Sequence, residues 1–215
     1  MTGQSYDIGD LAIEAALRPY GIAADAQLCQ SIREYIALLL RWNRQVSLTT
    51  VTDPVEILRF HFGESLFAAN AAPIRNGRLA DFGSGAGFPG IPLALVKPAL
   101  EVVLIESNAK KSAFLSEVKR LLDLRNLEIL CGRAEDLPEE KGPFDIVAAR
   151  AIGRFDGLLG WSSTHLGAGG SVVLWLGEAD AEIIRLNQPE WTWRAPIKIP
   201  ASARRVLLVG QKSKS

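Results

Sequence analysis

Apolar residues in the first third of the chain recur at helical spacing. They are Leu28, Ile32, Tyr35, Ile36, Leu39 and Leu40, which would lie on one side of a helix. A second helix is predicted to begin at Asp53, because Pro54 suits a first helical turn and Glu56 stands three residues after the cap, as in a capping box. We expect it to extend to about Ala69. The pattern therefore predicts a small helical N-terminal region over residues 1–72.

From about residue 78 the pattern changes to short apolar runs that alternate with longer helical segments. Strands are predicted at 78–82, 101–106, 127–131, 144–149 and 171–176, and helices at 90–96, 108–122 and 155–166. Such alternation predicts an α/β fold with a mainly parallel sheet and right-handed crossovers. Two last strands, at 191–199 and 204–210, are joined by a link too short for a helix and should form an antiparallel hairpin. We expect this Rossmann-like domain to occupy residues 73–215.

A glycine-rich loop connects the first predicted strand to the next helix. It reads Asp81-Phe82-Gly83-Ser84-Gly85-Ala86-Gly87-Phe88-Pro89-Gly90. Because glycine permits tight turns, peptide N–H groups of such a loop can face a polar ligand. The pattern G-x-G-x-x-G is met at Gly85, Gly87 and Gly90, which alone would suggest a dinucleotide. Asp81, two residues before Gly83, instead gives a spacing typical of S-adenosylmethionine (SAM) methyltransferases.

Polar residues follow the next strands in the order that a SAM site requires. Glu106 ends the second strand about twenty residues after the glycines, where a carboxylate can accept hydrogen bonds from both ribose hydroxyls. Ala134 and Glu135 follow the third strand, and their backbone is expected to meet the adenine edge. Arg150 follows the fourth strand. Its side chain is expected either to face the cleft or to be a surface cation.

Composition limits the classes of partner and site. The 215 residues contain 24 Lys and Arg against 24 Asp and Glu, so overall charge does not favour nucleic acid and any RNA contact must come from local basic clusters. The two cysteines, Cys29 and Cys131, are too few for a disulfide framework or a four-ligand metal site, and both are expected to be buried. With no apolar run of about 18 residues and no signal peptide, we expect a cytoplasmic protein without a membrane segment, and favour a monomer.

The motifs together resemble the glucose-inhibited division protein B family of bacterial small-subunit rRNA methyltransferases. They are Trp42-Asn43, Leu48-Thr49, His61 through Ser65-Leu66, the loop from Asp81 to Gly90, Gly132-Arg133-Ala134-Glu135, and Arg150-Ala151. The resemblance covers roughly residues 36 to 210 and implies SAM-dependent methylation of guanine N7 in 16S rRNA, with 16S rRNA or the small ribosomal subunit as partner. It also implies cofactor contacts or borders at Gly83, Phe88, Ala134, Glu135 and Arg150. The chain departs from the family at Ser47, Glu64 and Leu176, the last replacing a lysine expected to face RNA.

The implied chemistry requires no acid or base. Guanine N7 already carries a lone pair, so methyl transfer depends on alignment rather than proton removal. We therefore expect no catalytic side chain and no metal, and assign His61 to packing or interdomain hydrogen bonding. Two alternatives stay open at this point: a SAM methyltransferase of a small molecule or protein, and a nicotinamide-dependent oxidoreductase. The second is weaker, because no lysine stands four residues after Tyr6, Tyr20 or Tyr35, as a short-chain reductase would need.

Overall fold

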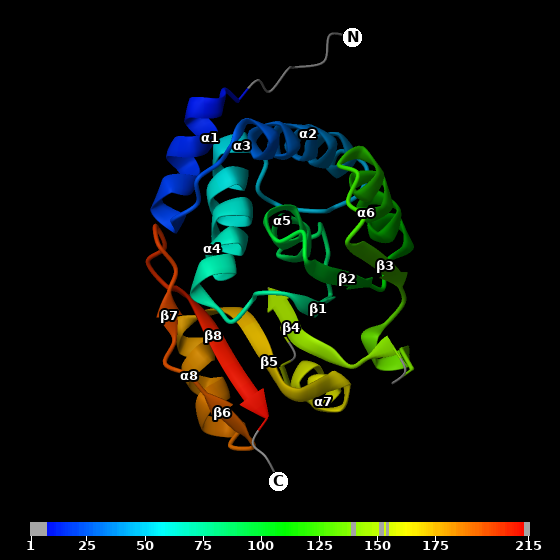
Figure 1. The fold of residues 1–215 in the computed structure, drawn as a ribbon, viewed down its shortest axis with the longest axis vertical. Coiled ribbons are helices and arrows are strands. Elements are labelled where there is room, and N and C mark those ends of the chain that lie inside the picture. Colours follow the sequence, from blue (N-terminus) through cyan, green and yellow to red (C-terminus); the bar gives the residue numbers. More distant parts are fainter. Residues whose placement is uncertain (1–7, 139–140, 151–152, 154, 213–215) are drawn as a thin grey trace.

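A computed structural model describes residues 8–138, 141–150, 153 and 155–212, and shows helices on both faces of one sheet (Figure 1). The N-terminal helices are α1 (Asp10–Leu17), a 3-10 turn (Arg18–Tyr20), α2 (Ala26–Asn43), α3 (Pro54–Glu56), a π-helical segment (Ile57–Gly63) and α4 (Glu64–Ala71). The Asp53 side chain accepts a hydrogen bond from the backbone N–H of Glu56 at 2.9 Å, which confirms the predicted helix start. The helix predicted after it is three consecutive helical segments, with a π-helical stretch in the middle.

The sheet combines five parallel strands with an antiparallel end. Its strands are β1 (Gly77–Phe82), β2 (Leu100–Glu106), β3 (Leu127–Cys131), β4 (Phe144–Arg150), β5 (Leu166–Gly177), β6 (Trp191–Trp193), β7 (Ile197–Lys198) and β8 (Arg205–Lys212). The strand order is β3-β2-β1-β4-β5-β8-β6, and β8 runs antiparallel to β5, β6 and β7. The expected Rossmann-like sheet with a C-terminal antiparallel part is confirmed. The strand expected over 191–199 is divided into β6 and β7, because Pro196 between them has no N–H to donate to β8.

Helices cover the two faces of the sheet according to the alternation of side chains along each strand. The sheet helices are α5 (Gly90–Val96), α6 (Ala109–Leu121), α7 (Phe155–His165) and α8 (Glu178–Asn187). Val102 and Leu104 of β2 pack with α5, α6 and the N-terminal helices, whereas Val103 and Ile105 pack with α7 and α8. This places the carboxyl ends of the parallel strands between two helical layers.

The N-terminal helices are joined to the sheet by both apolar and polar contacts. They share one hydrophobic cluster with α5, α6 and one face of the sheet. In addition, the indole N–H of Trp175 on β5 donates to the carbonyl of Glu64 at 2.8 Å, and both side chains are buried. The division of the chain at residue 72 stays a prediction.

The expectation for the cysteines is wrong at one position. Cys29 is buried on α2, but Cys131 is exposed. The reason is that Cys131 ends β3, which lies at the edge of the sheet and has a strand neighbour on one side only.

Candidate active site

The glycine-rich loop follows the carboxyl end of β1 and has one position packed against α2 and one position that is open. The backbone is left-handed at Gly85 and Gly87, with φ of +58° and +85°. A Cβ at Gly87 would lie 2.6 Å from the Tyr35 hydroxyl oxygen, whereas one at Gly85 would have only a backbone oxygen within 4 Å, at 3.9 Å. The Tyr35 hydroxyl donates to the carbonyl of Ala86 inside the loop. The loop is therefore packed against α2 at Gly87 and open at Gly85.

Asp81 is a buried carboxylate beneath this loop. Its Oδ2 accepts a hydrogen bond from the Gly90 N–H at 2.8 Å, while Oδ1 has no hydrogen-bond partner among the described residues. Burial is the main cause that raises the pKa of Asp81 from 3.8 to about 7, and nearby Glu106 raises it further. The Gly90 hydrogen bond and Arg150 act in the opposite direction. Asp81 thus holds the Gly90 end of the loop by a hydrogen bond, at a buried position where the ionised form of its carboxyl group is unfavourable.

Glu106 connects the end of β2 to both neighbouring segments. Its Oε2 accepts from the Gly85 N–H at 2.8 Å, and its Oε1 accepts from the Asn108 N–H at 2.7 Å. Each carboxylate oxygen has a second lone pair, so these bonds leave room for two further donors. The position and the remaining acceptor capacity of Glu106 fit the expected ribose contact.

A cavity of about 240 Å³ opens beside this loop. It is lined by Phe82, Gly83, Ile105, Ser107, Gly132, Arg133, Ala134 and Glu135. The structure therefore brings together Gly83, Ala134 and Glu135, three of the residues expected at the cofactor. Gly85, Phe88, Glu106 and Arg150 are not part of its lining, although Ile105 and Ser107 on either side of Glu106 are.

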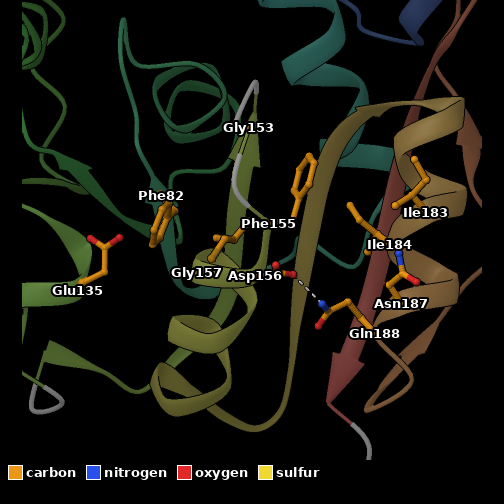
Figure 2. A pocket seen from close by; sticks show the side chains of 11 residues that line it. Phe82, Glu135, Gly153, Phe155, Asp156, Gly157, Ile183, Ile184, Asn187 and Gln188 are labelled. Atoms are coloured by element: carbon orange, nitrogen blue, oxygen red, sulfur yellow. Dashed lines mark hydrogen bonds between the residues drawn. The ribbon is translucent and has the colours of Figure 1, made fainter.

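A second cavity of about 770 Å³ adjoins the first and shares Phe82 and Glu135 with it (Figure 2). Figure 2 shows these two side chains on one side, the start of α7 in the middle and Ile183 and Ile184 of α8 on the far side. Asp156 accepts a hydrogen bond from Gln188 at 2.9 Å across the two helices. The two cavities therefore adjoin at Phe82, the last residue of β1, and at Glu135.

The Phe88 side chain points into the protein. It is 8% exposed and stacks on Tyr35, with ring centroids 5.3 Å apart and planes inclined by 5°. It also stacks on His61 at 4.8 Å. The ring therefore anchors the loop to the N-terminal helices, and cofactor contact at Phe88 stays a prediction.

Arg150 is not a surface cation, so that alternative is wrong. Its side chain is 8% exposed, and its guanidinium lies 3.2 Å from the carboxylate of Glu64 and donates to the carbonyl of Phe60. Glu64 is completely buried and also pairs with Arg205 at 3.1 Å. Burial raises the pKa of Glu64, and the two arginines act in the opposite direction. Burial also lowers the pKa of Arg150, to about 10. Cofactor contact by Arg150 stays a prediction.

Sequence reasoning missed the roles of Glu64 and Arg205. The available signal was a carboxylate that stands between the apolar residues Phe62 and Leu66 on a helix, which predicts a buried and therefore paired acid. Its partners lie far away in the sequence, on β4 and β8.

The expected packing and hydrogen-bonding role of His61 is confirmed. Its Nε2 lies 2.8 Å from the Thr49 hydroxyl, and its Nδ1 lies 3.3 Å from the Arg150 guanidinium. Burial, followed by repulsion from Arg150 and Arg205, lowers the pKa of His61 to about 3, so the ring is neutral. Because the guanidinium can only donate, Nδ1 accepts, and Nε2 carries the proton that is donated to Thr49.

The described residues offer neither a metal site nor a membrane-spanning helix. Within the described ranges, no group of three His, Cys, Asp or Glu side chains is placed to hold a metal ion. None of the described helices is long and apolar enough to cross a membrane. Ala151, part of a motif quoted above, lies outside the described residues.

Solved structures of methyltransferases share this fold. A ribosomal protein L11 methylase from Lactobacillus delbrueckii subsp. bulgaricus matches with a TM-score of 0.60 and 15% identity, covering 73% of this chain and 80% of that one. The glycopeptide N-methyltransferase MtfA in complex with SAM matches with a TM-score of 0.58 and 13% identity, covering 72% and 88%. At such identities the likeness concerns the fold alone.

Sequence relatives identify the family. The protein from Xanthomonas euvesicatoria pv. vesicatoria named ribosomal RNA small subunit methyltransferase G is 37% identical, over 94% of this chain and 94% of its own length. The protein of the same name from Roseiflexus castenholzii is 35% identical, over 88% of this chain and 86% of its own. The profile of the GidB family, described as rRNA small subunit methyltransferase G, matches residues 28–205. The chain belongs to the rRNA small subunit methyltransferase G family.

Proposed function

We propose that this protein transfers a methyl group from SAM to N7 of a guanine in bacterial 16S rRNA. The family and the names of its relatives support a methyltransferase of small-subunit rRNA. The structural observation that carries the proposal is Glu106, whose carboxylate accepts a hydrogen bond from the Gly85 N–H of the glycine-rich loop. Its neighbours in the chain, Ile105 and Ser107, line the cavity that Gly83, Ala134 and Glu135 also line. This is the position at the carboxyl ends of parallel strands where nucleotide-like ligands bind.

The residues present fit SAM. The open space at Gly85 allows a ligand to cross the loop without meeting a side chain. Glu106 would accept hydrogen bonds from the ribose hydroxyls, and Ala134 and Glu135 would border the adenine. Ile105, buried at the end of β2, gives the cavity an apolar wall.

The transfer itself needs alignment rather than proton movement. Bound SAM would supply a methyl group on a positively charged sulfur. The N7 lone pair would accept this methyl group, the C–S bonding pair would stay with the sulfur, and no proton would leave the guanine. The task of the protein is to hold the two reactants in line and to exclude water. The neutral, doubly hydrogen-bonded state of His61 fits a site that uses no general base.

Mapping the methylated atom tests the proposal. The protein and SAM are incubated with small-subunit rRNA, both free and in assembled subunits, and the RNA is treated with borohydride and then aniline. Methylation at N7 leaves a positively charged imidazole ring that this treatment opens, so one new cleavage is expected. Glu106→Ala, which removes the proposed ribose contact, should reduce the cleavage.

The outcomes separate the proposal from its alternatives. Methyl incorporation without a new cleavage would contradict N7 as the target. No incorporation into either RNA, with SAM binding intact, would favour a small molecule or protein as substrate. We further propose a cytoplasmic monomer, and light scattering that gives a dimer mass would contradict the monomer.

A further inference from the structure

An exposed aromatic side chain lies next to the buried ion pairs at the carboxyl edge of the sheet. Phe60 belongs to the π-helical segment and is 37% exposed. Its carbonyl accepts a hydrogen bond from the guanidinium of Arg150, the last residue of β4. The backbone of Phe60 therefore lies at the strand end beside which the methyl transfer is proposed to occur, although Phe60 lines neither of the two cavities described above.

The backbone that carries Phe60 is held on several sides. Arg150 is itself paired with buried Glu64, whose carbonyl accepts from Trp175 on β5. The next residue, His61, stacks on Phe88 of the glycine-rich loop. An exposed ring on a fixed backbone can bind a planar partner with little loss of conformational freedom.

Positive charge is in excess near the backbone of Phe60. The single carboxylate of Glu64 faces two guanidiniums, those of Arg150 and Arg205, which leaves one excess positive charge. The guanidiniums of Arg150 and Arg205 both lie within 3.2 Å of the same Glu64 oxygen, Oε2, so these two charges are close in space. Arg59 directly precedes Phe60 in the sequence, and Arg204 directly precedes Arg205. The side chains of Arg59 and Arg204 are both exposed. Glu178, the first residue of α8, pairs with Lys198 at 3.3 Å.

We propose that Phe60 stacks on a base that flanks the methylated guanine, while Arg59, Arg204 and Arg205 bind the adjacent phosphates. Aromatic stacking with cationic neighbours is how single-stranded nucleic acid is held. A flanking base is favoured over the target base because Phe60 lies outside the two cavities. This inference rests on the proposed rRNA substrate and names a contact for it.

Steady-state methylation of small ribosomal subunits tests the inference. Phe60→Ala and Phe60→Leu should each raise KM for the subunit roughly 5- to 100-fold, the range expected for losing one stacked base. Phe60→Trp should keep KM near that of the wild type, because it retains an aromatic face. The dissociation constant of SAM and the melting temperature, measured for every variant, should stay unchanged. Arg204→Gln should reduce the dependence of RNA binding on salt by about one phosphate contact.

Leu121→Ala is the matched control, because Leu121 is 43% exposed at the end of α6, a helix that starts at the carboxyl edge of the sheet and runs away from it. Its KM should equal that of the wild type. A wild-type KM in Phe60→Leu would overturn the stacking contact, because an apolar but non-aromatic side chain would then suffice. If the wild type itself methylates no small-subunit RNA, the proposed function fails and this inference falls with it. If the wild type methylates the subunit and Phe60→Ala has an unchanged KM, this inference fails while the proposed function stands.

Discussion

The buried carboxylate of Asp81 should make the stability of the protein depend on pH. Burial is the largest cause that raises its pKa from 3.8 to about 7. An acid whose pKa is higher in the folded state contributes full stability below its unfolded pKa, and this contribution is lost as the pH rises through the folded pKa. The loss should therefore occur between about pH 4 and pH 7. Replacing Asp81 by asparagine removes the titration while preserving an oxygen that can accept from the Gly90 N–H.

The size of the effect follows from the two pKa values. A rise from 3.8 to about 7, at about 1.4 kcal/mol for each pH unit, gives at most about 4 kcal/mol of unfolding free energy. His61 acts in the opposite sense, because its pKa is lowered to about 3 and its contribution is present above 6.5 and lost as the pH falls. The comparison must therefore be made between wild type and variant, which share His61.

Urea unfolding at a series of pH values measures this difference. The unfolding free energy of the wild type minus that of Asp81→Asn should decrease by up to about 4 kcal/mol between about pH 4 and pH 8. Asp53→Asn makes the same chemical change at an exposed helix cap, and any dependence that both variants share is subtracted. A difference between wild type and Asp81→Asn that does not change with pH would refute the reasoning.

Three further changes probe the loop. Glu106→Gln should weaken SAM binding by about 1–3 kcal/mol, because the amide nitrogen cannot accept the hydrogen bonds that a carboxylate oxygen accepts; calorimetry that gives an unchanged dissociation constant would contradict the ribose contact. Gly85→Ala should lower the unfolding free energy by about 1–2 kcal/mol, since a Cβ is strained in the left-handed region, and an unaltered urea midpoint would argue against this backbone conformation. Tyr35→Phe should cost about 1–3 kcal/mol by leaving the Ala86 carbonyl unpaired, and thermal melting that matches the wild type would show that this hydrogen bond is unimportant.

The sequence was sufficient for the parts of the fold that local pattern determines. Apolar runs alternating with helices correctly predicted the five parallel strands, because the strands inside the sheet are buried on both faces and the helices between them have an apolar side. The edge strand β3 is only partly buried, but its apolar run was still sufficient. Helix α8 was missed for a physical reason. It buries only Ala181 and Ile184 while exposing Ile183 and Leu186, so its apolar residues do not form a stripe.

The candidate site was predictable where it depends on the order of the parallel strands and of the residues that follow them in the sequence. The ends of adjacent parallel strands meet at one edge, which is why Gly83, Ala134 and Glu135 line one cavity. The environment of Arg150 was not predictable, because its partner Glu64 lies on a helix of the N-terminal region and no local pattern relates the two residues. The inward direction of Phe88 likewise depends on an aromatic stack with Tyr35 that only the tertiary fold creates.

The contrast between the two cysteines gives a chemical means of observing the cavity beside the loop. Cys131 is exposed and immediately precedes Gly132 and Arg133 of the cavity lining, whereas Cys29 is buried. A thiol reagent added to the folded protein should therefore modify one position selectively. A fluorophore attached to Cys131 would report on changes in the cavity at the end of β3. No cysteine has to be engineered into the chain for that purpose.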